Sequence, residues 1–304
     1  MILLYHLVFP DSTPPSTYNA GDVLRLADYK RHMLWLKKHF EIISLQEYLH
    51  VLPQSPARLR KKIALTFDDG YRSTLELVLP FLEEQQIPAT FFLTTAHLIK
   101  EELLWFVYFN ALCFEDAYAE LQIQNQPHPL SSKKSRLLAW RKLIDLARQS
   151  GDAIAFSTQF AQNYPLPGHI IHKYQGLTVD QIAALGKSEL FEIGGHTHNH
   201  PYLDQISGSA QLVEILQNKG ILEGISGKSL RFFAYTGGVY NAQSIEAVKK
   251  ARFEAALSVI PRNFGSDPLY ELPRIDIYSP SLMKLKLKVF GLLSLLNRLG
   301  IRAK

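Results

Sequence analysis

The feature that most constrains the fold of this chain is a regular alternation of short apolar stretches and amphipathic helical stretches. The apolar stretches 61–67 and 88–94 have the length of buried strands, and a stretch of helical periodicity, 73–86, lies between them. The second half of the chain, from residue 178 onward, repeats this order with short connections. Strands that alternate with helices in this way pair in parallel and carry the helices on their faces. We therefore predict an α/β fold with a mostly parallel sheet that closes into a barrel.

The predicted elements cover most of the chain. The predicted strands are 2–8, 61–67, 88–94, 191–196, 230–238 and 255–260. The predicted helices are 26–40, 73–86, 178–188, 210–220 and 242–251. The stretch 41–49 predicts a short strand that runs into a helix, with Ser44 and Glu47 forming a capping box.

Residues 101–177 interrupt this order, because they are helical and aromatic, with a polar, proline-containing connection at 124–132. We interpret them as a helical insertion between two barrel strands, so that residues 1–304 form one domain. The single cysteine, Cys113, lies in an apolar part of this insertion, and it excludes an internal disulfide framework.

Length and composition exclude several classes of protein. A chain of 304 residues with 47% hydrophobic and 20% charged residues is typical of a folded protein with a large core. No stretch reaches the roughly 18 apolar residues that a membrane span needs. The opening residues 1–10 lack the basic region and the long apolar run of a secretion signal. We therefore expect a cytoplasmic protein, unless the true start lies upstream.

The positive charge of the chain is concentrated at its C-terminal end. The net charge is +5, and the segment 283–304 holds six basic and no acidic residues, which leaves about −1 for the rest. A nearly neutral body argues against nucleic-acid binding, which needs a basic face. The segment 279–304 is either a final helix packed on the barrel or an amphipathic anchor at the inner, anionic face of a membrane. Its apolar stripe consists of Val289, Leu292, Leu293, Leu296 and Leu299 or Gly300.

Two adjacent carboxylates stand at a predicted strand end. The sequence TFDDG places Asp68 and Asp69 directly after the strand 61–67. A solvated turn is the simplest explanation for Asp-Asp-Gly taken alone. In such a fold, however, catalytic residues lie at the carboxyl ends of the strands. A bound cation would relieve the electrostatic repulsion between the two neighbouring carboxylates.

The sequence GGHTHNH at 194–200 holds three histidines at alternate positions. In an extended chain their rings would all point the same way. If the chain instead turns after Gly195, His196 and His200 become i, i+4 neighbours and His198 points elsewhere. Two such histidines and one carboxylate form the ligand set of a catalytic zinc that keeps an open position, whereas the alternative is a polar surface loop.

With these motifs the chain resembles the polysaccharide deacetylase family, also called the NodB homology domain or carbohydrate esterase family 4. The resemblance extends to the stretches LLYHLV, IPATFFL, RFFAYTGG and LPRIDI, and the opening YH is similar to the subset with poly-N-acetylglucosamine deacetylases. It implies a distorted (β/α) barrel of the NodB type. It also implies Asp68 as general base and Asp69, His196 and His200 as metal ligands.

The resemblance further implies a cofactor and a reaction. The cofactor is a divalent metal, with Zn²⁺ favoured and Co²⁺, Ni²⁺ or Mn²⁺ as alternatives, which activates water and polarises the amide carbonyl. A backbone N–H of the YTGG turn, which contains Tyr235 and Gly237, stabilises the oxyanion. The substrate is a carbohydrate, an N-acetylated amino sugar of a bacterial polysaccharide or of its lipid-linked precursor. The alternatives are removal of a formyl group or an O-acetyl ester from a lipid-linked sugar, or a catalytically impaired carbohydrate-binding protein.

The chain departs from the family pattern at two places. The family has an arginine that steadies the base where this chain has Ala234, so this arginine is missing unless Arg231 or Arg274 substitutes for it. The family's C-terminal Leu-x-His motif supplies a general acid, but here the matching LPR ends in Arg274, which donates no proton near neutral pH. We therefore prefer His6 as the acid and keep His198 as the second candidate.

Two aromatic residues are candidates for stacking on a sugar. They are Trp105 and Tyr235, both in apolar stretches of the sequence. Aromatic residues in such stretches belong more often to the core.

Overall fold

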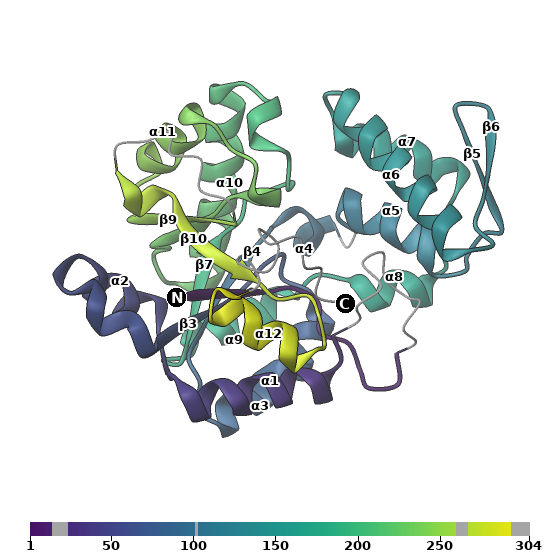
Figure 1. Cartoon of the computed structure of the whole chain (residues 1–304). Helices are drawn as coiled ribbons and strands as arrows, with labels where there is room; N and C mark the ends of the chain where they lie inside the picture. The colour runs from purple at the N-terminus through teal and green to yellow at the C-terminus, as the bar shows by residue number, and fades with distance from the viewer. Residues whose placement is uncertain (14–23, 101–102, 260–266, 293–304) are drawn as a thin grey trace.

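Seven parallel strands close into a barrel in the described part of the chain (Figure 1). The computed structural model describes residues 1–13, 24–100, 103–259 and 267–292. The barrel strands are β1 (Ile2–Tyr5), β3 (Lys62–Phe67), β4 (Ala89–Leu93), β7 (Phe191–Gly195), β8 (Phe232–Ala234), β9 (Ala255–Ser258) and β10 (Leu272–Asp276). Their order is β1-β10-β9-β8-β7-β4-β3, and the pairing of β1 with β3 completes the circle. The predicted α/β barrel is therefore confirmed.

An eighth parallel strand, β2 (Glu41–Ile43), pairs with the beginning of β3. Helix α2 (Leu45–Gln54) follows it, and its side chain Leu45 joins an apolar cluster that contains Ala64 and Phe92 of the strands. The hydroxyl of Ser44 accepts the N–H of Glu47 at 3.0 Å, as predicted for a helix cap. The Glu47 carboxylate instead contacts Lys62 at 3.2 Å, so only one of the two hydrogen bonds of the predicted capping box forms.

Helices cover the outside of the barrel and bury one face each. They are α1 (Leu26–His39), α3 (Arg72–Glu84), α9 (Val179–Lys187), α10 (Gly208–Ser226) and α11 (Ala242–Lys250). In α1 the residues at spacings of three and four, Tyr29, Met33 and Leu36, are fully buried. The amphipathic pattern of the sequence therefore predicts which face contacts the sheet.

The interruption at 101–177 forms a lobe beside the barrel, on the right in Figure 1. After α4 (Ala96–Lys100) come α5 (Trp105–Phe114), β5 (Glu120–Ile123), β6 (Gln126–Pro129), α6 (Lys133–Gln149), α7 (Ala153–Asn163) and α8 (Gly168–Tyr174). The lobe lies between β4 and β7 in sequence and has its own apolar cluster, with Phe109, Leu112 and Leu143 at its centre. Between β4 and β7 the described residues of this lobe therefore form helices and one short hairpin.

Two local predictions were wrong. The polar connection at 124–132 contains a β-hairpin, whose turn residues Gln124 and Asn125 have φ of 52° and 60°. The sequence has no glycine there, so the usual hairpin signal is absent. The predicted strand 230–238 ends at Ala234, because Gly237 and Gly238 have φ of 58° and 65° and turn the chain.

The described part of the C-terminal segment packs on the barrel helices. Helix α12 (Leu282–Val289) contacts α1 and buries Leu285 and Val289. Of the other residues in the predicted apolar stripe, Leu292 is exposed, and Leu293, Leu296, Leu299 and Gly300 lie outside the described residues. Membrane contact by this segment stays a prediction. Among the described residues, no helix has both the length and the apolar character required to cross a bilayer.

Candidate metal centre

The polar motifs meet at one end of the barrel because all the barrel strands run in parallel. Asp68 and Asp69 directly follow β3, His196 directly follows β7, and Thr236 comes shortly after β8. In barrels of this kind the carboxyl ends of the strands form the face that carries the active site. The prediction that these motifs share one end of the sheet therefore holds.

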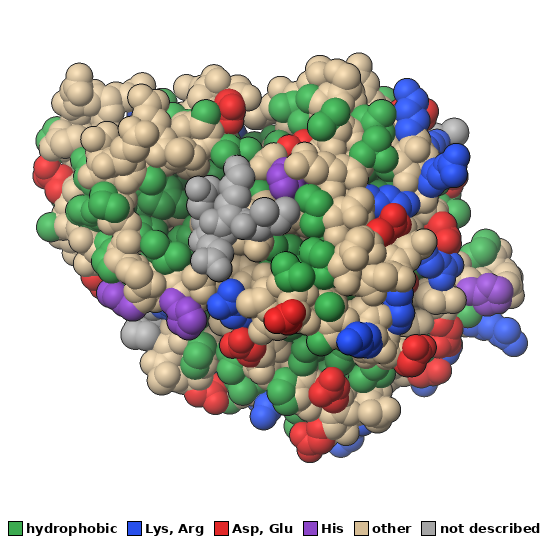
Figure 2. Space-filling view, turned by 180° about the vertical axis from the view of Figure 1, so that it is seen from behind, with side chains coloured by type: hydrophobic (Ala, Val, Ile, Leu, Met, Phe, Trp, Pro, Cys, Tyr) green, Lys and Arg blue, Asp and Glu red, His purple; other side chains and the backbone are tan. Residues whose placement is uncertain are grey.

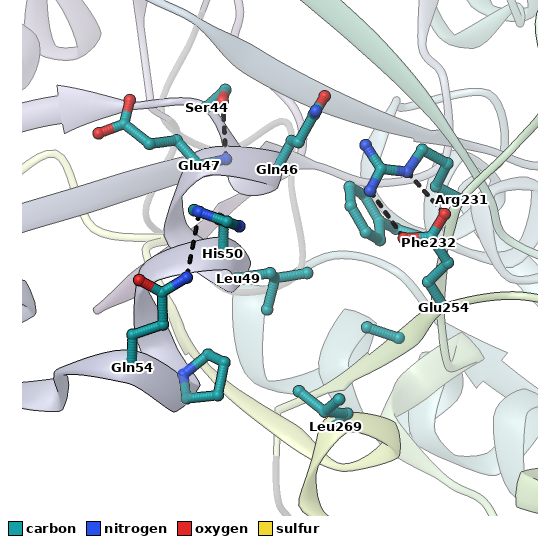
Figure 3. Close-up of a pocket in the computed structure, with 12 residues that line it drawn as sticks. Ser44, Gln46, Glu47, Leu49, His50, Gln54, Arg231, Phe232, Glu254 and Leu269 are labelled. Atoms are coloured by element: carbon teal, nitrogen blue, oxygen red, sulfur yellow. Dashed lines mark hydrogen bonds and ion pairs between the residues drawn. The ribbon is translucent and has the colours of Figure 1, made fainter.

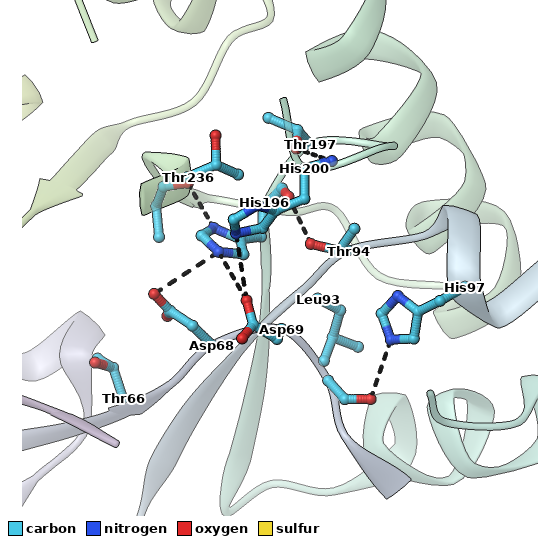
Figure 4. A network of polar contacts seen from close by, with 12 residues as sticks. Thr66, Asp68, Asp69, Leu93, Thr94, His97, His196, Thr197, His200 and Thr236 are labelled. Carbon is cyan, nitrogen blue, oxygen red and sulfur yellow. Dashed lines mark hydrogen bonds and ion pairs between the residues drawn. The ribbon is translucent and has the colours of Figure 1, made fainter. Parts of the chain in front are cut away.

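Asp69, His196 and His200 form a compact buried cluster (Figure 4). One carboxylate oxygen of Asp69, Oδ1, lies 3.4 Å from Nε2 of His196 and 3.4 Å from Nε2 of His200. The three candidate ligand atoms all lie within 4.8 Å of one another. Two imidazole nitrogens and one carboxylate are the donor set of a catalytic zinc site, so these residues fit a divalent cation.

Three residues with left-handed backbone shape this cluster. Asp69, Thr197 and His200 have φ of 73°, 58° and 56°. Such values are unusual for residues other than glycine, and for a β-branched threonine they are strained. The turn at Thr197 is stabilised by its hydroxyl, which accepts the N–H of His200 at 3.1 Å. These turns bring the two outer histidines together without a helix.

The ring of His196 is oriented by a backbone carbonyl. Its Nδ1 lies 2.8 Å from the oxygen of Ala234, which can only accept a hydrogen bond. Nδ1 therefore carries the proton in the neutral ring, and Nε2 faces Asp69 with its lone pair free for a metal. Burial lowers the pKa of His196, but the charges of Asp68 and Asp69 outweigh burial and raise it overall.

Asn218 of α10 supports the same loop from behind. Its Oδ1 accepts the N–H of His196 at 3.0 Å, and its Nδ2 donates to the carbonyls of Leu93 and Thr197 at 2.9 and 2.7 Å. The side chain is fully buried. Asn218 was not among the predicted site residues. The feature of the sequence that could have indicated it is a polar residue on the apolar face of a helix.

Arg274 holds the proposed base. Its two terminal nitrogens each donate to one oxygen of Asp68 at 2.7 Å, and both side chains are almost completely buried. Burial raises the pKa of Asp68, but the guanidinium and His196 outweigh burial and lower it overall. Arg231 instead pairs with Glu254 at 2.8 and 2.7 Å, ahead of β8 and β9. Of the two arginines considered, Arg274 is therefore the one beside the carboxylate.

The two candidate acids lie in different surroundings. His6 follows β1, stacks on Tyr278 with ring centres 5.2 Å apart, and has a buried Nδ1 without a hydrogen bond. The Nδ1 of His198 lies 2.8 Å from the hydroxyl of Thr95, so this ring helps to hold the loop. The surroundings favour His6.

The predicted substrate-contacting rings are both buried. Trp105 is 3% exposed, and its indole N–H donates to the carbonyl of His200 at 3.0 Å. Tyr235 is 1% exposed, donates to the carbonyl of Tyr270 and stacks on Tyr240. Neither ring presents a face for a sugar in this structure, because core packing occupies both.

Two other residues near the cluster define the space around it. Gly237, in the turn after β8, has φ of 58°, and a Cβ there would lie 3.0 Å from the ring of Tyr202. A larger side chain at this position would therefore be strained. Phe106, which the sequence analysis did not identify, contacts the ring of His200 with centres 4.5 Å apart.

A large cavity of about 880 Å³ lies away from this cluster (Figure 3). It is lined by α2 and by residues that precede or begin β8 and β9, including Arg231 and Glu254. Its charged pair is satisfied internally, and His50 contacts Gln54 at 3.1 Å. No metal ligands gather there among the described residues. We therefore place the functional site at the carboxyl ends of the strands.

Comparison with known proteins agrees with this geometry. Residues 56–256, about two thirds of the chain, match the family model described as polysaccharide deacetylase. The chain therefore belongs to the polysaccharide deacetylase family, and the resemblance drawn from the motifs is confirmed. No curated protein sequence matches the chain.

Solved structures show the same fold at low sequence identity. The Streptococcus pyogenes deacetylase PplD is 18% identical with a TM-score of 0.60, over 93% of this chain and 96% of that chain. A de-N-acetylase from Aggregatibacter actinomycetemcomitans is 16% identical with a TM-score of 0.58, over 94% and 98%. IcaB from Ammonifex degensii is 14% identical with a TM-score of 0.57, over 95% of each chain.

Proposed function

We propose that this member of the polysaccharide deacetylase family is a metal-dependent hydrolase that removes N-acetyl groups from amino sugars. The substrate is a polysaccharide or its lipid-linked precursor. The observation that carries the proposal is the buried cluster of Asp69, His196 and His200 beside the paired carboxylate of Asp68. A bare surface turn would not bury two aspartates and two histidines together.

The cluster would hold the divalent cation, with Zn²⁺ favoured and Co²⁺, Ni²⁺ or Mn²⁺ as alternatives. When bound, such a cation supplies Lewis acidity toward water and the amide carbonyl. Asp69 would contribute an ionised carboxylate as a ligand, because its pKa is held well below the usual range. Burial opposes this ionisation, but the two imidazoles beside the carboxylate, His196 and His200, outweigh burial.

Asp68 serves as the general base. Its pKa is lowered overall, so it is ionised at neutral pH and ready to accept the proton of the attacking water. The two bonds from Arg274 leave the carboxylate little freedom to rotate. Arg274 therefore acts as a positioning residue for Asp68.

The later steps need an oxyanion donor and an acid. A backbone N–H of the turn that contains Gly237 would donate to the oxyanion, and the departing amine would take its proton from His6. The position of His6 directly after β1, with a buried Nδ1 that makes no hydrogen bond, supports this assignment.

An assay of acetate release tests the proposal. The purified protein, loaded with Zn²⁺ or Co²⁺, is given oligomers of N-acetylglucosamine beside the Asp68→Asn variant. We expect acetate from the wild-type protein and at least about 100-fold less from the variant. Release no greater than that of the variant would exclude deacetylation of this substrate. N-formyl sugars, followed by release of formate, and O-acetyl sugars, followed by release of acetate, separate the other hydrolases from a protein that only binds carbohydrate.

A further inference from the structure

Tyr278 is the aromatic neighbour of His6, the residue to which we assign the general acid. The two rings stack, with centres 5.2 Å apart and planes inclined by 18°. This separation lies within the range of favourable ring pairs. Tyr278 is 40% exposed, whereas Trp105 and Tyr235 are buried. The stack therefore joins an accessible ring to a residue of the proposed reaction.

The pairing of β1 with β10 places His6 and Tyr278 side by side. Leu4 lies opposite Asp276 in the register of these two parallel strands. Two residues further along each strand stand His6 and Tyr278. The N–H of Ile277 donates to the carbonyl of Leu4 at 2.8 Å, so the alignment continues past the end of β10. The stack is therefore a consequence of barrel closure.

The pairing of β1 with β3 brings the same histidine next to the proposed base. Tyr5 lies opposite Phe67, and the N–H of Asp68 donates to the carbonyl of Tyr5 at 3.1 Å. His6 and Asp68 therefore leave neighbouring strands at the same level. The segment that carries His6 thus lies between the segment of Asp68 and the segment of Tyr278.

The ring of His6 lacks a hydrogen bond that could orient it. Its Nδ1 is buried and has no hydrogen-bond partner among the described residues. Reactive and metal-binding histidines are commonly oriented by a hydrogen bond at the second ring nitrogen. For His196 the carbonyl of Ala234 accepts that bond. For His6 the contact that can restrain the imidazole is the stacked ring of Tyr278.

The backbone on both sides of Tyr278 is anchored. Lys288 of α12 donates to the carboxylate of Asp276 at 3.1 Å. The carbonyl of Pro280 lies 3.2 Å from Nε2 of His32, a buried residue of α1. Tyr278 therefore belongs to a segment that two helices hold in place, although its own ring is partly exposed.

We propose that Tyr278 is a positioning residue, which holds the imidazole of His6 where it protonates the departing amine. The inference rests on the function proposed above. In the reaction a C–O bond forms between water and the acetyl carbon, and the proton of the water goes to Asp68. The C–N bond breaks, and the nitrogen takes its proton from His6. β10 then supports both proton transfers, because Arg274 holds Asp68 and the residue shortly after the strand holds His6.

Two substrates with different leaving groups test this role. Oligomers of N-acetylglucosamine release an amine that needs a proton, whereas 4-nitrophenyl acetate releases a phenolate that departs without one. We expect Tyr278→Ala to lower kcat on the oligomers by about 10-fold, part of what a general acid contributes, and to keep the rate on the ester within about 2-fold. A loss that is equal on both substrates would show a merely structural role and overturn the proposal.

Variants of His6 show whether the tyrosine acts through it. We expect His6→Gln to lower kcat on the oligomers by about 100-fold, and Tyr278→Ala to cause no further loss in that background. Tyr278→Phe keeps the stacked ring and should recover most of the rate that Tyr278→Ala loses. A further loss in the double variant, or a wild-type rate of either single variant on the oligomers, would overturn the proposal.

A tyrosine in the insertion provides the matched control. Figure 2 shows hydrophobic side chains on the left of the view, over the insertion, so this lobe also has apolar groups at the surface. Tyr118 is partly exposed there, and its ring contacts that of Tyr164 with centres 5.2 Å apart. Tyr118→Ala should leave both rates unchanged. Tyr278→Leu, which keeps apolar bulk without a flat ring, replaces Tyr278→Ala if that variant does not fold.

A measurement without turnover separates this inference from the proposed function. A ring stacked on the imidazole shifts the NMR signals of the His6 ring protons upfield, and His6→Gln assigns those signals. We expect Tyr278→Ala to abolish the upfield shift and Tyr278→Phe to retain it. Absence of acetate release by the wild-type protein would reject the deacetylase function, while the shift still reports the contact. Signals that Tyr278→Ala leaves unchanged would overturn the positioning role.

Discussion

At the scale of single residues, the pair of Asp68 and Arg274 is the main departure from the family pattern. The arginine comes from β10, 206 residues away from the aspartate in sequence, and not from the strand that supplies it elsewhere in the family. Its planar fork matches the two carboxylate oxygens. The same support for the base is therefore retained from a different strand.

Replacing Arg274 by lysine tests this pairing. Arg274→Lys keeps the positive charge but loses the two parallel bonds, so Asp68 is held less firmly. We expect kcat to fall on the order of 10-fold to 100-fold while KM and metal content change little. Acetate release and metal analysis check both values. An unchanged kcat would show that a positive charge alone is sufficient to position Asp68. The control is Arg231→Lys, because Arg231 pairs with Glu254 and not with Asp68.

At the scale of elements, helix α10 fixes the loop that carries the histidines. Asn218 satisfies one N–H and two carbonyls that would otherwise be buried without partners. An unsatisfied buried polar group costs more than a typical hydrogen bond contributes. The helix therefore contributes both packing and polar contacts to the site.

We expect Asn218→Leu to lower the free energy of unfolding by about 2–3 kcal/mol, because several backbone groups lose their partner. It should also weaken metal binding, since the N–H of His196 is left free. Gln217→Leu, at the exposed neighbouring position of the same helix, should change stability by less than about 0.5 kcal/mol. Chemical denaturation of both variants measures the difference; equal stabilities would contradict the assigned role.

Strand β7 carries a carboxyl group that makes stability depend on pH. Burial raises the pKa of Glu192 to about 7, although the hydroxyl of Thr90 and the charge of Arg231 partly oppose this. A folded-state pKa above the unfolded value means that protonation favours the folded state. The stability contributed by the protonated group is complete below about pH 4.5 and is lost as the pH rises through 7.

Glu192→Gln removes this loss, because glutamine stays neutral at every pH. We expect the variant to exceed the wild-type protein in free energy of unfolding at pH 8, with a smaller difference at pH 5. Urea unfolding at the two pH values measures it. A constant difference between pH 5 and pH 8 would contradict the raised pKa.

At the scale of the whole molecule, the metal centre joins segments that are far apart in sequence. Asp69 follows β3, and both histidines follow β7, with the entire insertion between them. A cation bound by these residues stabilises the folded state over the unfolded state. The metal should therefore act on global stability and not only on activity.

We expect Zn²⁺ at about 100 times its Kd to stabilise the protein by about 2.7 kcal/mol, and chelation to reverse this. Thermal unfolding measures the shift. His200→Ala should show no shift, whereas His198→Ala, whose ring contacts Thr95, should respond as the wild-type protein does. An equal response of His200→Ala would refute the ligand assignment.

Most of the architecture could be predicted because helix and strand periodicity are local properties of the sequence. The α/β alternation with parallel strands and the burial of one face of α1 follow from that periodicity, whereas closure of the barrel depends on the pairing of β1 with β3. The hairpin at Gln124 and Asn125 could not be predicted, since its two left-handed turn residues carry no glycine signal. The strand β8 was predicted to extend to residue 238, because Gly237 and Gly238 were included in it. In the structure these two glycines turn the chain.

The sequence by itself determined which residue types stand at the strand ends, and the closed barrel brings Asp69, His196 and His200 together there. Only the tertiary structure decided that Arg274, not Arg231, pairs with Asp68. It also decided that Trp105 is buried and donates a hydrogen bond to the loop that carries His200. The physical reason is that such contacts depend on strand register and on packing between segments that lie 95 and 206 residues apart in the chain. Local spacing carries information about a turn or a helix face, but not about which distant side chain reaches it.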